Sequence, residues 1–388
     1  RKGRAMSDAA IIQNGAMTVT GGKIVWVGKS SASSHFKASE VVDAEGMAVV
    51  PGFVDAHTHL IFAGSRENEL AMKLEGLSYM DIMKGGGGIY STVRATRNAS
   101  KSQLVDEGLA RARRMLAMGT TTLEAKTGYC LDTEGELKML EAAEEVRRKS
   151  GLDIVHTFLG AHALSPDFKD FDDYAEHIID EMLPAVAGSK LARHCDVFCE
   201  KGVFDVPQSR AILQAARKLK FGLKLHADEV FPLRGARLAA EMNAISADHM
   251  LATPKKDFPY IAKRGTIGVM LPGTPYVLMQ NEYADARGMM DSGMAVALAT
   301  DLNPNCWLES MQMVQSLACY KMRMTPAEAL CAATINAAHA IGMGSKVGSL
   351  EPGNQADFLV LDVPTIDGIP YRWGGNVVSE VWKRGTRI

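Results

Sequence analysis

The chain has 388 residues, of which 47% are hydrophobic and 23% charged, and its formal net charge is −2. This composition is that of an ordinary globular protein long enough for one large and one smaller domain. A net charge so close to zero gives no overall field that would attract nucleic acid or an acidic membrane surface. No run of 18 apolar residues occurs, so we expect no membrane-spanning helix.

The N-terminal segment and the cysteines bear on location. Residues 1–17 include basic side chains but no long apolar core, which is not the pattern of a secretory signal. None of the six cysteines forms a Cys-x-x-Cys pair, and a chain of this length does not suggest a disulfide framework. We therefore expect reduced thiols and a cytoplasmic protein. The cysteines are Cys130, Cys195, Cys199, Cys306, Cys319 and Cys331.

The two ends of the chain have the same pattern of short alternating segments between tight turns. The pattern predicts that residues 1–50 and 346–388 pair into one small composite β domain, a β-sandwich. Its expected strands are residues 16–20, 23–27, 41–43, 347–362 (with a turn) and 377–383.

Between the ends, over residues 51–345, apolar strands alternate with helical stretches, which indicates an α/β fold with a parallel sheet. Eight such units over this length predict a closed (β/α)8 TIM-like barrel. The alternative is an open doubly wound sheet, whose Gly-rich fingerprint would stand where His-Thr-His follows the first strand. The expected strands are residues 49–59, 120–127, 153–162, 195–200, 222–229, 244–249, 266–271 and 295–301, and the clearest helices are 101–118, 134–149, 206–219, 234–241 and 326–342.

The first strand ends in a His-x-His pair, His57 and His59. Residues two apart in a strand point to the same side, so both imidazoles would reach one point. A lone pair of this kind is weak support for a metal site, and a loop that happens to hold two histidines is the plainer interpretation.

The other strand ends strengthen the metal interpretation, because in barrel enzymes the chemistry lies at the C-terminal ends of the strands. Five of the ten histidines stand at these ends, which a random scatter would rarely give. A mixed nitrogen and oxygen ligand set suits Zn²⁺ or Fe²⁺ and lowers the pKa of a bound water toward neutrality. We predict one divalent metal per chain, zinc or iron. The polar strand ends are His57, His59, Lys126, Tyr129, His162, Glu200, His226, Glu229, His249 and Asp301, of which His57, His59, His226 and Asp301 are the candidate ligands.

Three side chains besides the candidate ligands could take part in the chemistry: Glu229, His249 and Arg66. Glu229 and His249 would be free to move protons, although Glu229 could instead orient a ligand histidine. Asp301 counts both as a ligand and as a catalytic group. Arg66 follows the first strand, and its planar fork suits a substrate carboxylate, although a loop Arg is more often solvated. The glycines of residues 85–88 could offer backbone N–H groups to an anion or form a hinge.

These motifs resemble the amidohydrolase superfamily, and within it the imidazolonepropionase family, over nearly the whole chain. The barrel motifs alone are similar to the superfamily at large, whereas the segments at 86–97, 126–129 and 197–200 are more particular to imidazolonepropionases. The motifs are PGFVDAHTHLIFAGSRENE (51–69), GGGIYSTVRATR (86–97), EAKTGYCLDTEGELKML (124–140), TFLGAHA (157–163), DVFCEKGVF (196–204), HADE (226–229), SADHM (246–250) and ALATDLNP (297–304).

The resemblance implies hydrolysis of the cyclic amide C–N bond of 4-imidazolone-5-propanoate to N-formimino-L-glutamate, a step of histidine degradation. It implies a mononuclear zinc or iron site, proton transfer by Glu229 and His249, and a homodimer. It also implies a small-molecule substrate whose carboxylate meets Arg66. The other implied substrate contacts are Tyr79, Tyr129, His162, Glu229 and Asn303.

Three positions depart from the family pattern. Cys130 stands where the family usually has Gly, and Asn305 and Cys306 stand where it has Gly and then Ser or Thr. Asn305 adds bulk near the substrate, and the Cys306 thiol forms weaker hydrogen bonds than a hydroxyl. These changes leave open a second hypothesis, a deaminase or hydrolase that acts on another small carboxylate-bearing nitrogen ring. A catalytically inactive barrel kept for binding is a third hypothesis, but such a barrel is expected to have lost ligands or proton-transfer groups.

Overall fold

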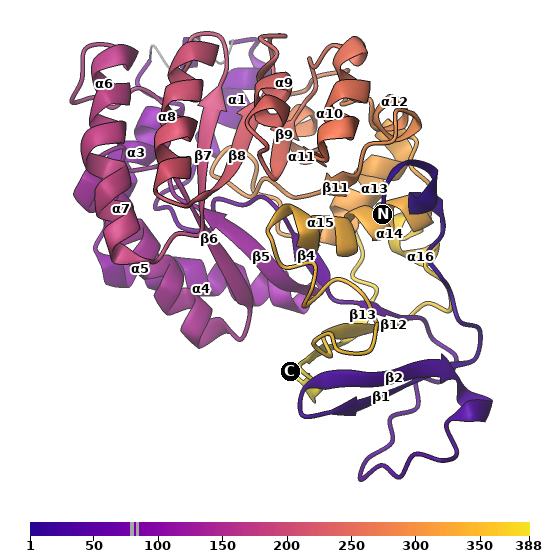
Figure 1. Cartoon of the computed structure of the whole chain (residues 1–388). Coiled ribbons are helices and arrows are strands. Elements are labelled where there is room, and N and C mark those ends of the chain that lie inside the picture. Colours follow the sequence, from indigo (N-terminus) through magenta and orange to yellow (C-terminus); the bar gives the residue numbers. More distant parts are fainter. Residues whose placement is uncertain (78–80, 83–84) are drawn as a thin grey trace.

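The computed structural model describes residues 1–77, 81–82 and 85–388, and shows a barrel wrapped by helices with small sheets beside it (Figure 1). The barrel strands are β4 (Phe53–Asp55), β5 (Thr120–Lys126), β6 (Asp153–Ala161), β7 (His194–Cys199), β8 (Gly222–Ala227), β9 (Ser246–His249), β10 (Ile267–Met270) and β11 (Val296–Leu298). They form one parallel sheet in sequence order, from β4 to β11. The predicted (β/α)8 barrel is thereby confirmed, and the open doubly wound alternative is wrong.

The barrel closes between its first and last strands through the two segments that follow them. The backbone N–H of Asp301 donates to the carbonyl of His57 at 3.1 Å, and that of His59 donates to the carbonyl of Leu302 at 2.8 Å. Thr58 and Leu302 form a parallel bridge. The closure therefore brings the His-x-His pair and Asp301 together at one end of the barrel.

Helices cover the outside of the sheet (Figure 1). Their ends follow local sequence signals: Asp132 accepts a hydrogen bond from the N–H of Gly135, and Asp205 with Gln208 forms a capping box. Among the described residues, no helix is both long and apolar enough to cross a bilayer. The helices are α1 (Asn68–Leu74), α3 (Ile89–Asn98), α4 (Lys101–Ala117), α5 (Thr133–Ser150), α6 (Phe171–His177), α7 (Leu183–Ser189), α8 (Val206–Lys218), α9 (Gly235–Glu241), α10 (Phe258–Arg264), α11 (Gly273–Val277), α12 (Ala286–Asp291), α13 (Met311–Met322), α14 (Pro326–Ala332), α15 (Ile335–Ala340) and α16 (Gly368–Tyr371).

Both ends of the chain contribute to the small sheets. One sheet has the order β14-β13-β12-β3, so a strand from before the barrel pairs with strands from after it. The hairpin β1–β2 is tied to this region by the N–H of Ile24, which donates to the carbonyl of Asn354. These strands are β1 (Gly15–Thr20), β2 (Lys23–Lys29), β3 (Val49–Pro51), β12 (Phe358–Leu361), β13 (Val378–Lys383) and β14 (Thr386–Arg387).

The structure corrects three element predictions. The predicted strand 49–59 is two strands that separate at Gly52, because β3 pairs with β12 while β4 pairs with β5. Residues 41–43 form no strand: Val41 is 85% exposed, and no strand in the described part of the chain pairs with this segment. The predicted helix 326–342 is divided into α14 and α15 at Thr334, whose φ of −129° and ψ of −95° are not helical.

Candidate active site

The predicted ligand side chains converge at the C-terminal end of the barrel. His57 and His59 flank the bridge residue Thr58, His226 is the fifth residue of β8, and Asp301 follows β11. One ligand atom each of His57, His59 and His226 lie within 4.8 Å of one another, and the same holds for His57, His249 and Asp301. All of these side chains are buried.

Two of the histidines are oriented by carboxylates. Nδ1 of His57 lies 2.7 Å from Asp248, and Nδ1 of His226 lies 3.1 Å from Asp196. Their Nε2 atoms are buried and have no hydrogen-bond partner among the described residues. A carboxylate on one ring nitrogen and an open second nitrogen is the usual arrangement of a metal-binding histidine. These residues therefore fit a divalent metal ion.

The electrostatic environment keeps the imidazoles in the form that binds metal. Burial lowers the pKa of His57 well below its usual value, and the nearby Lys126 ammonium lowers it further. Burial also lowers the pKa of His59 and of His249. Neutral imidazole is the ligand form, so no proton must leave these rings when a cation binds.

Asp301 faces the histidines from the last strand. One of its carboxylate oxygens lies 3.4 Å from Nε2 of His57 and 3.8 Å from Nε2 of His59. Its second oxygen accepts a hydrogen bond from the hydroxyl of Thr274 at 2.5 Å. Asp301 has a left-handed backbone with φ of 55°, as has His249 with φ of 75°. Such strain in non-glycine residues is typical of functional sites, where the surroundings hold a side chain in place.

Glu229 and His249 lie together beside the cluster, with 3.7 Å between Oε2 of the carboxyl and Nε2 of the imidazole. Burial raises the pKa of Glu229 to about 8, and the charges of Asp301 and Glu200 add to the shift. Glu200 also accepts hydrogen bonds from the N–H groups of Val230 and Phe231, which fixes the loop that carries Glu229. A raised pKa lets the Glu229 carboxyl hold a proton at neutral pH, whereas the lowered pKa of His249 keeps its imidazole neutral, so the pair offers one proton donor and one proton acceptor.

Tyr129 and His162 form the neighbouring wall. The His162 ring stacks on His59 with 4.9 Å between centroids, and the Tyr129 ring lies 5.3 Å from that of His59. His162 Nδ1 lies 3.0 Å from the carbonyl of Gly128. The loop of residues 128–131 is held by Glu136, which accepts the N–H groups of Gly128, Cys130 and Leu131.

Arg66 is buried, so the plainer interpretation of a solvated loop arginine is wrong. Its Nε and Nη2 donate to the two oxygens of Glu69 at 2.9 and 2.7 Å. Glu69 also accepts the N–H of Gly88 at 2.7 Å. One backbone N–H group of the glycine segment therefore meets an anion, and that anion is a side chain of this protein. Glu69 stands three residues after Arg66, a spacing at which the ion pair could have been found from the sequence.

Asn305 and Cys306, the two positions of the last loop that differ from the family pattern, form hydrogen bonds that hold this loop in shape. The side chain of Asn303 donates to the carbonyl of Asp301 and accepts the N–H groups of Asn305 and Cys306. The buried Cys306 thiol lies 3.7 Å from the carbonyl of Thr300, and Asn305 accepts a hydrogen bond from Lys73 at 2.6 Å. Tyr79, a predicted substrate contact, lies outside the described residues.

The carboxylates Asp196 and Asp248 were not among the site residues predicted from the sequence. Each is a carboxylate within a predicted barrel strand and is fully buried in the structure, and a charged residue at such a strand position was the available signal. Only the fold shows which histidine each carboxylate meets.

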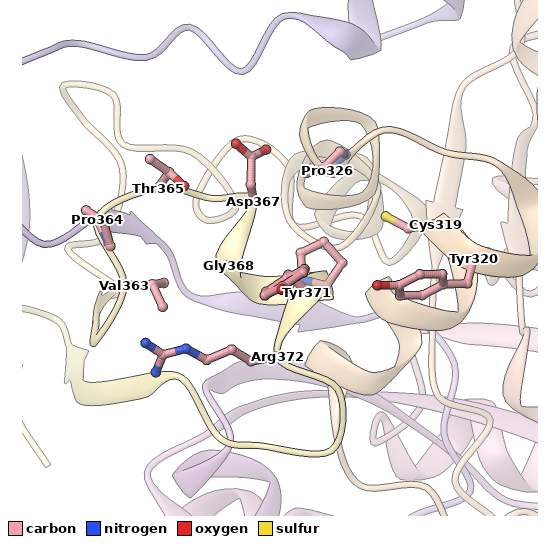
Figure 2. A pocket seen from close by; sticks show the side chains of 11 residues that line it. Cys319, Tyr320, Pro326, Val363, Pro364, Thr365, Asp367, Gly368, Tyr371 and Arg372 are labelled. Atoms are coloured by element: carbon pink, nitrogen blue, oxygen red, sulfur yellow. The ribbon is translucent and has the colours of Figure 1, made fainter.

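A separate surface pocket of about 560 Å³ lies between α13 and the segment around α16 (Figure 2). Its lining is mostly apolar, with Tyr320 and Tyr371 at its sides and Asp367 and Arg372 as its charged side chains. It contains no histidine, so we place the chemistry at the barrel end and not here.

Comparison with known proteins agrees with the site. The amidohydrolase family model matches residues 48–388. An imidazolonepropionase from Alkaliphilus oremlandii (strain OhILAs) is 46% identical over 99% of this chain and 92% of its own length. One from Geobacillus kaustophilus (strain HTA426) is 49% identical over 98% of this chain and 91% of its own. The chain belongs to the imidazolonepropionase family of amidohydrolases. It is therefore a hydrolytic enzyme.

Solved structures confirm the architecture. A zinc-bound adenosine deaminase from Xanthomonas campestris matches with a TM-score of 0.73 and 20% identity, over 96% of this chain and 88% of that one. A 5-methylcytosine deaminase from Klebsiella pneumoniae matches with a TM-score of 0.75 and 16% identity, over 96% and 93%. At such low identity these likenesses show the shared fold alone.

Proposed function

We propose that the protein hydrolyses 4-imidazolone-5-propanoate to N-formimino-L-glutamate in histidine degradation. The observation that carries the proposal is the full-length identity to imidazolonepropionases, together with the buried cluster of His57, His59, His226 and Asp301. In this reaction the C–N bond at the ring carbonyl breaks. The oxygen of water becomes part of a new carboxylate, the ring nitrogen gains a proton, and the formimino group stays intact.

The metal would be held by His57, His59, His226 and Asp301, and it is zinc or iron because both accept this ligand set. When bound, it lowers the pKa of a water ligand toward neutrality. Two features support this set: the unpartnered buried Nε2 atoms of His57 and His226, and the carboxylates behind their rings.

Glu229 and His249 would handle the protons. Hydrolysis takes one proton from water and delivers one to the ring nitrogen, so a pair of groups 3.7 Å apart can serve as base and acid. Glu229 with its raised pKa would also hydrogen-bond the polar ring of the substrate. Asp301 would act beside them as a ligand whose carboxylate also orients the attacking water.

The propanoate of the substrate would meet Arg66, whose guanidinium is held in place by the ion pair with Glu69. A planar guanidinium has several edges, so one edge can pair with Glu69 while another pairs with a carboxylate. Tyr129 and His162 would pack against the ring of the substrate. Asn303 would contact the substrate or product from the last loop, and Tyr79, outside the described residues, is a further proposed substrate contact.

We also propose a cytoplasmic homodimer. The six free cysteines support a reducing compartment. Light scattering coupled to size-exclusion chromatography tests the dimer, and a monomeric mass would contradict it.

The deciding experiment follows freshly prepared 4-imidazolone-5-propanoate by its ultraviolet absorbance on protein of known metal content. We expect loss of absorbance well above the spontaneous rate, abolished by a chelator and restored separately by Zn²⁺ or by Fe²⁺ without oxygen. Absence of turnover at one metal per chain would overturn the proposal.

A hydrolase or deaminase of another small carboxylate-bearing nitrogen ring is the second candidate, favoured by Asn305 and Cys306 in the last loop. Ammonia release from a panel of such rings would identify a deaminase, and loss of ring absorbance without turnover of 4-imidazolone-5-propanoate would identify a hydrolase of another ring; opening 4-imidazolone-5-propanoate itself releases no ammonia.

A further inference from the structure

A layer of buried charges lies in the barrel next to the histidine cluster. Its members come from the inward-facing positions of four strands, and each is at most 1% exposed. They are Glu124 and Lys126 of β5, Asp196 of β7, Lys224 of β8 and Asp248 of β9. Three carboxylates and two ammonium groups in a dry interior are costly unless their geometry is well matched.

Lys126 occupies the centre of this layer. Its Nζ lies 2.5 Å from Asp196, 2.9 Å from Glu124 and 3.5 Å from Asp248. Burial disfavours the ammonium form, but the three carboxylates together raise the pKa of Lys126, so that it stays charged. One ammonium group therefore joins the two carboxylates that orient His226 and His57.

Lys224 differs in one respect that matters for this layer. Its Nζ lies 3.2 Å from Glu124 and 3.7 Å from Asp248, and it donates to the carbonyls of Ala56 and Ala340. Among the described contacts it has none with Asp196. The two lysines thus carry the same charge in the same layer, while only Lys126 joins both histidine carboxylates.

We propose that Lys126 is a positioning residue for the metal site. By joining Asp196 to Asp248 it fixes the spacing of the His226 and His57 rings, so that both Nε2 atoms face one point. The inference rests on the proposed ligand set. Without Lys126, the two carboxylates have lost their shared partner and are free to turn away from the Nδ1 atoms.

The positive charge of Lys126 and its role as a tether have opposite effects on metal affinity. Removal of a positive charge near a cation site strengthens cation binding by Coulomb's law. Loss of a tether weakens it, and loss of partners outside the ligand shell commonly costs about 10-fold in metal affinity. The sign of the change therefore separates the two roles of Lys126.

The experiment measures the zinc dissociation constant by competition with a chromophoric chelator, for the wild-type chain, Lys126→Met and Lys224→Met. We expect Lys126→Met to bind zinc about 10-fold more weakly or worse, and Lys224→Met to bind it no more weakly than wild type. Unchanged or tighter binding by Lys126→Met overturns the proposal, as does an equal loss in both variants.

A remote buried lysine controls for general destabilisation. Lys383 pairs with Asp153 and Asp357 at 2.7 and 2.6 Å, away from the site, so Lys383→Met should lower the thermal midpoint but leave zinc affinity unchanged. If Lys126→Met does not fold, Asp196→Asn tests the same tether, because it keeps an acceptor for His226 but loses the ion pair. Undiminished zinc affinity in that variant overturns the proposal.

The proposed function fails in a different way. A folded wild-type chain that binds no zinc or iron overturns the ligand set itself. One zinc per wild-type chain with unchanged binding by Lys126→Met overturns the tether alone.

Discussion

The carboxylate of Asp248 lies 2.7 Å from Nδ1 of His57, although 191 residues separate the two in the chain. Both side chains are fully buried. The contact keeps the proton on Nδ1 and leaves Nε2 to face His59 and His226. The pair thereby joins the first strand of the barrel to the sixth at the point where a metal is proposed.

We predict that Asp248→Ala lowers metal affinity about 10–100-fold, because the His57 ring loses the partner that fixes its orientation. Chelator competition measures the change. Ser246→Ala is the control within the same strand, since Ser246 donates to the other oxygen of Asp248 at 2.6 Å and does not contact His57. A larger loss in Ser246→Ala than in Asp248→Ala would contradict the prediction.

We predict that His249→Ala keeps its metal and lowers kcat/KM about 10²–10⁴-fold, as expected for loss of a proton-transfer group. Metal analysis and the absorbance assay are needed together. His35→Ala, an exposed change in the N-terminal region, should have full activity. A His249→Ala chain without metal would show that His249 is a ligand, and unchanged turnover would refute its catalytic role.

We predict that Arg66→Lys raises KM for 4-imidazolone-5-propanoate about 10–100-fold, because a bidentate charged contact is lost. The same ring without its propanoate provides the control substrate. Wild type and variant should turn it over equally if Arg66 acts on the carboxylate. An equal loss on both substrates would mean that Arg66 supports the loop instead.

We predict that Gly119→Ala destabilises the fold by about 2–4 kcal/mol. Gly119 has φ of 94°, and a Cβ there would lie 2.8 Å from Leu359 and 3.0 Å from Phe53 and Val378, where the barrel meets the small sheet. Gly46→Ala is the matched control, with φ of 77° and nothing within 4 Å, and should cost about 1 kcal/mol. Urea unfolding measures both, and equal costs would mean that the junction adjusts to the methyl group.

We predict that Asp153 makes stability fall in acid. Although burial opposes ionisation, Lys383, Gln355 and Arg384 lower the pKa of Asp153 below its usual value. In the unfolded chain the pKa of an Asp is about 4. Because the pKa of Asp153 is lower in the folded chain, its contribution to stability is complete above about pH 4 and is lost as the pH falls through the folded-state pKa. Asp153→Asn should cost about 1.5–3 kcal/mol at pH 7.

The difference between wild type and Asp153→Asn should shrink between pH 5 and 3, measured by urea unfolding at each pH. Asp106→Asn is a control on the exposed surface of α4 and should follow wild type throughout. A difference that stays constant over this pH range would mean that the Asp153 contacts stabilise through shape and not through charge.

Much of the fold followed from local pattern. The alternation of apolar strands with helices predicted the barrel, because a parallel sheet of eight such units closes upon itself. Local pattern failed where strand pairing sets the ends of a strand. From the sequence β3 and β4 were predicted as one strand, but they separate at Gly52 because β3 pairs with β12 and β4 pairs with β5. Val41 and Val42 have strand-forming side chains, but none of the strands that the structure describes pairs with them.

The sequence by itself determined which side chains gather at the barrel end, since His57, His226 and Asp301 all stand where parallel strands end. Only the tertiary structure decided what lies behind them. The contacts of Asp248 with His57 and of Lys126 with Asp196 depend on the register of strands far apart in the chain. A pattern of period two shows that a residue faces inward, but barrel closure alone shows which residue it meets there.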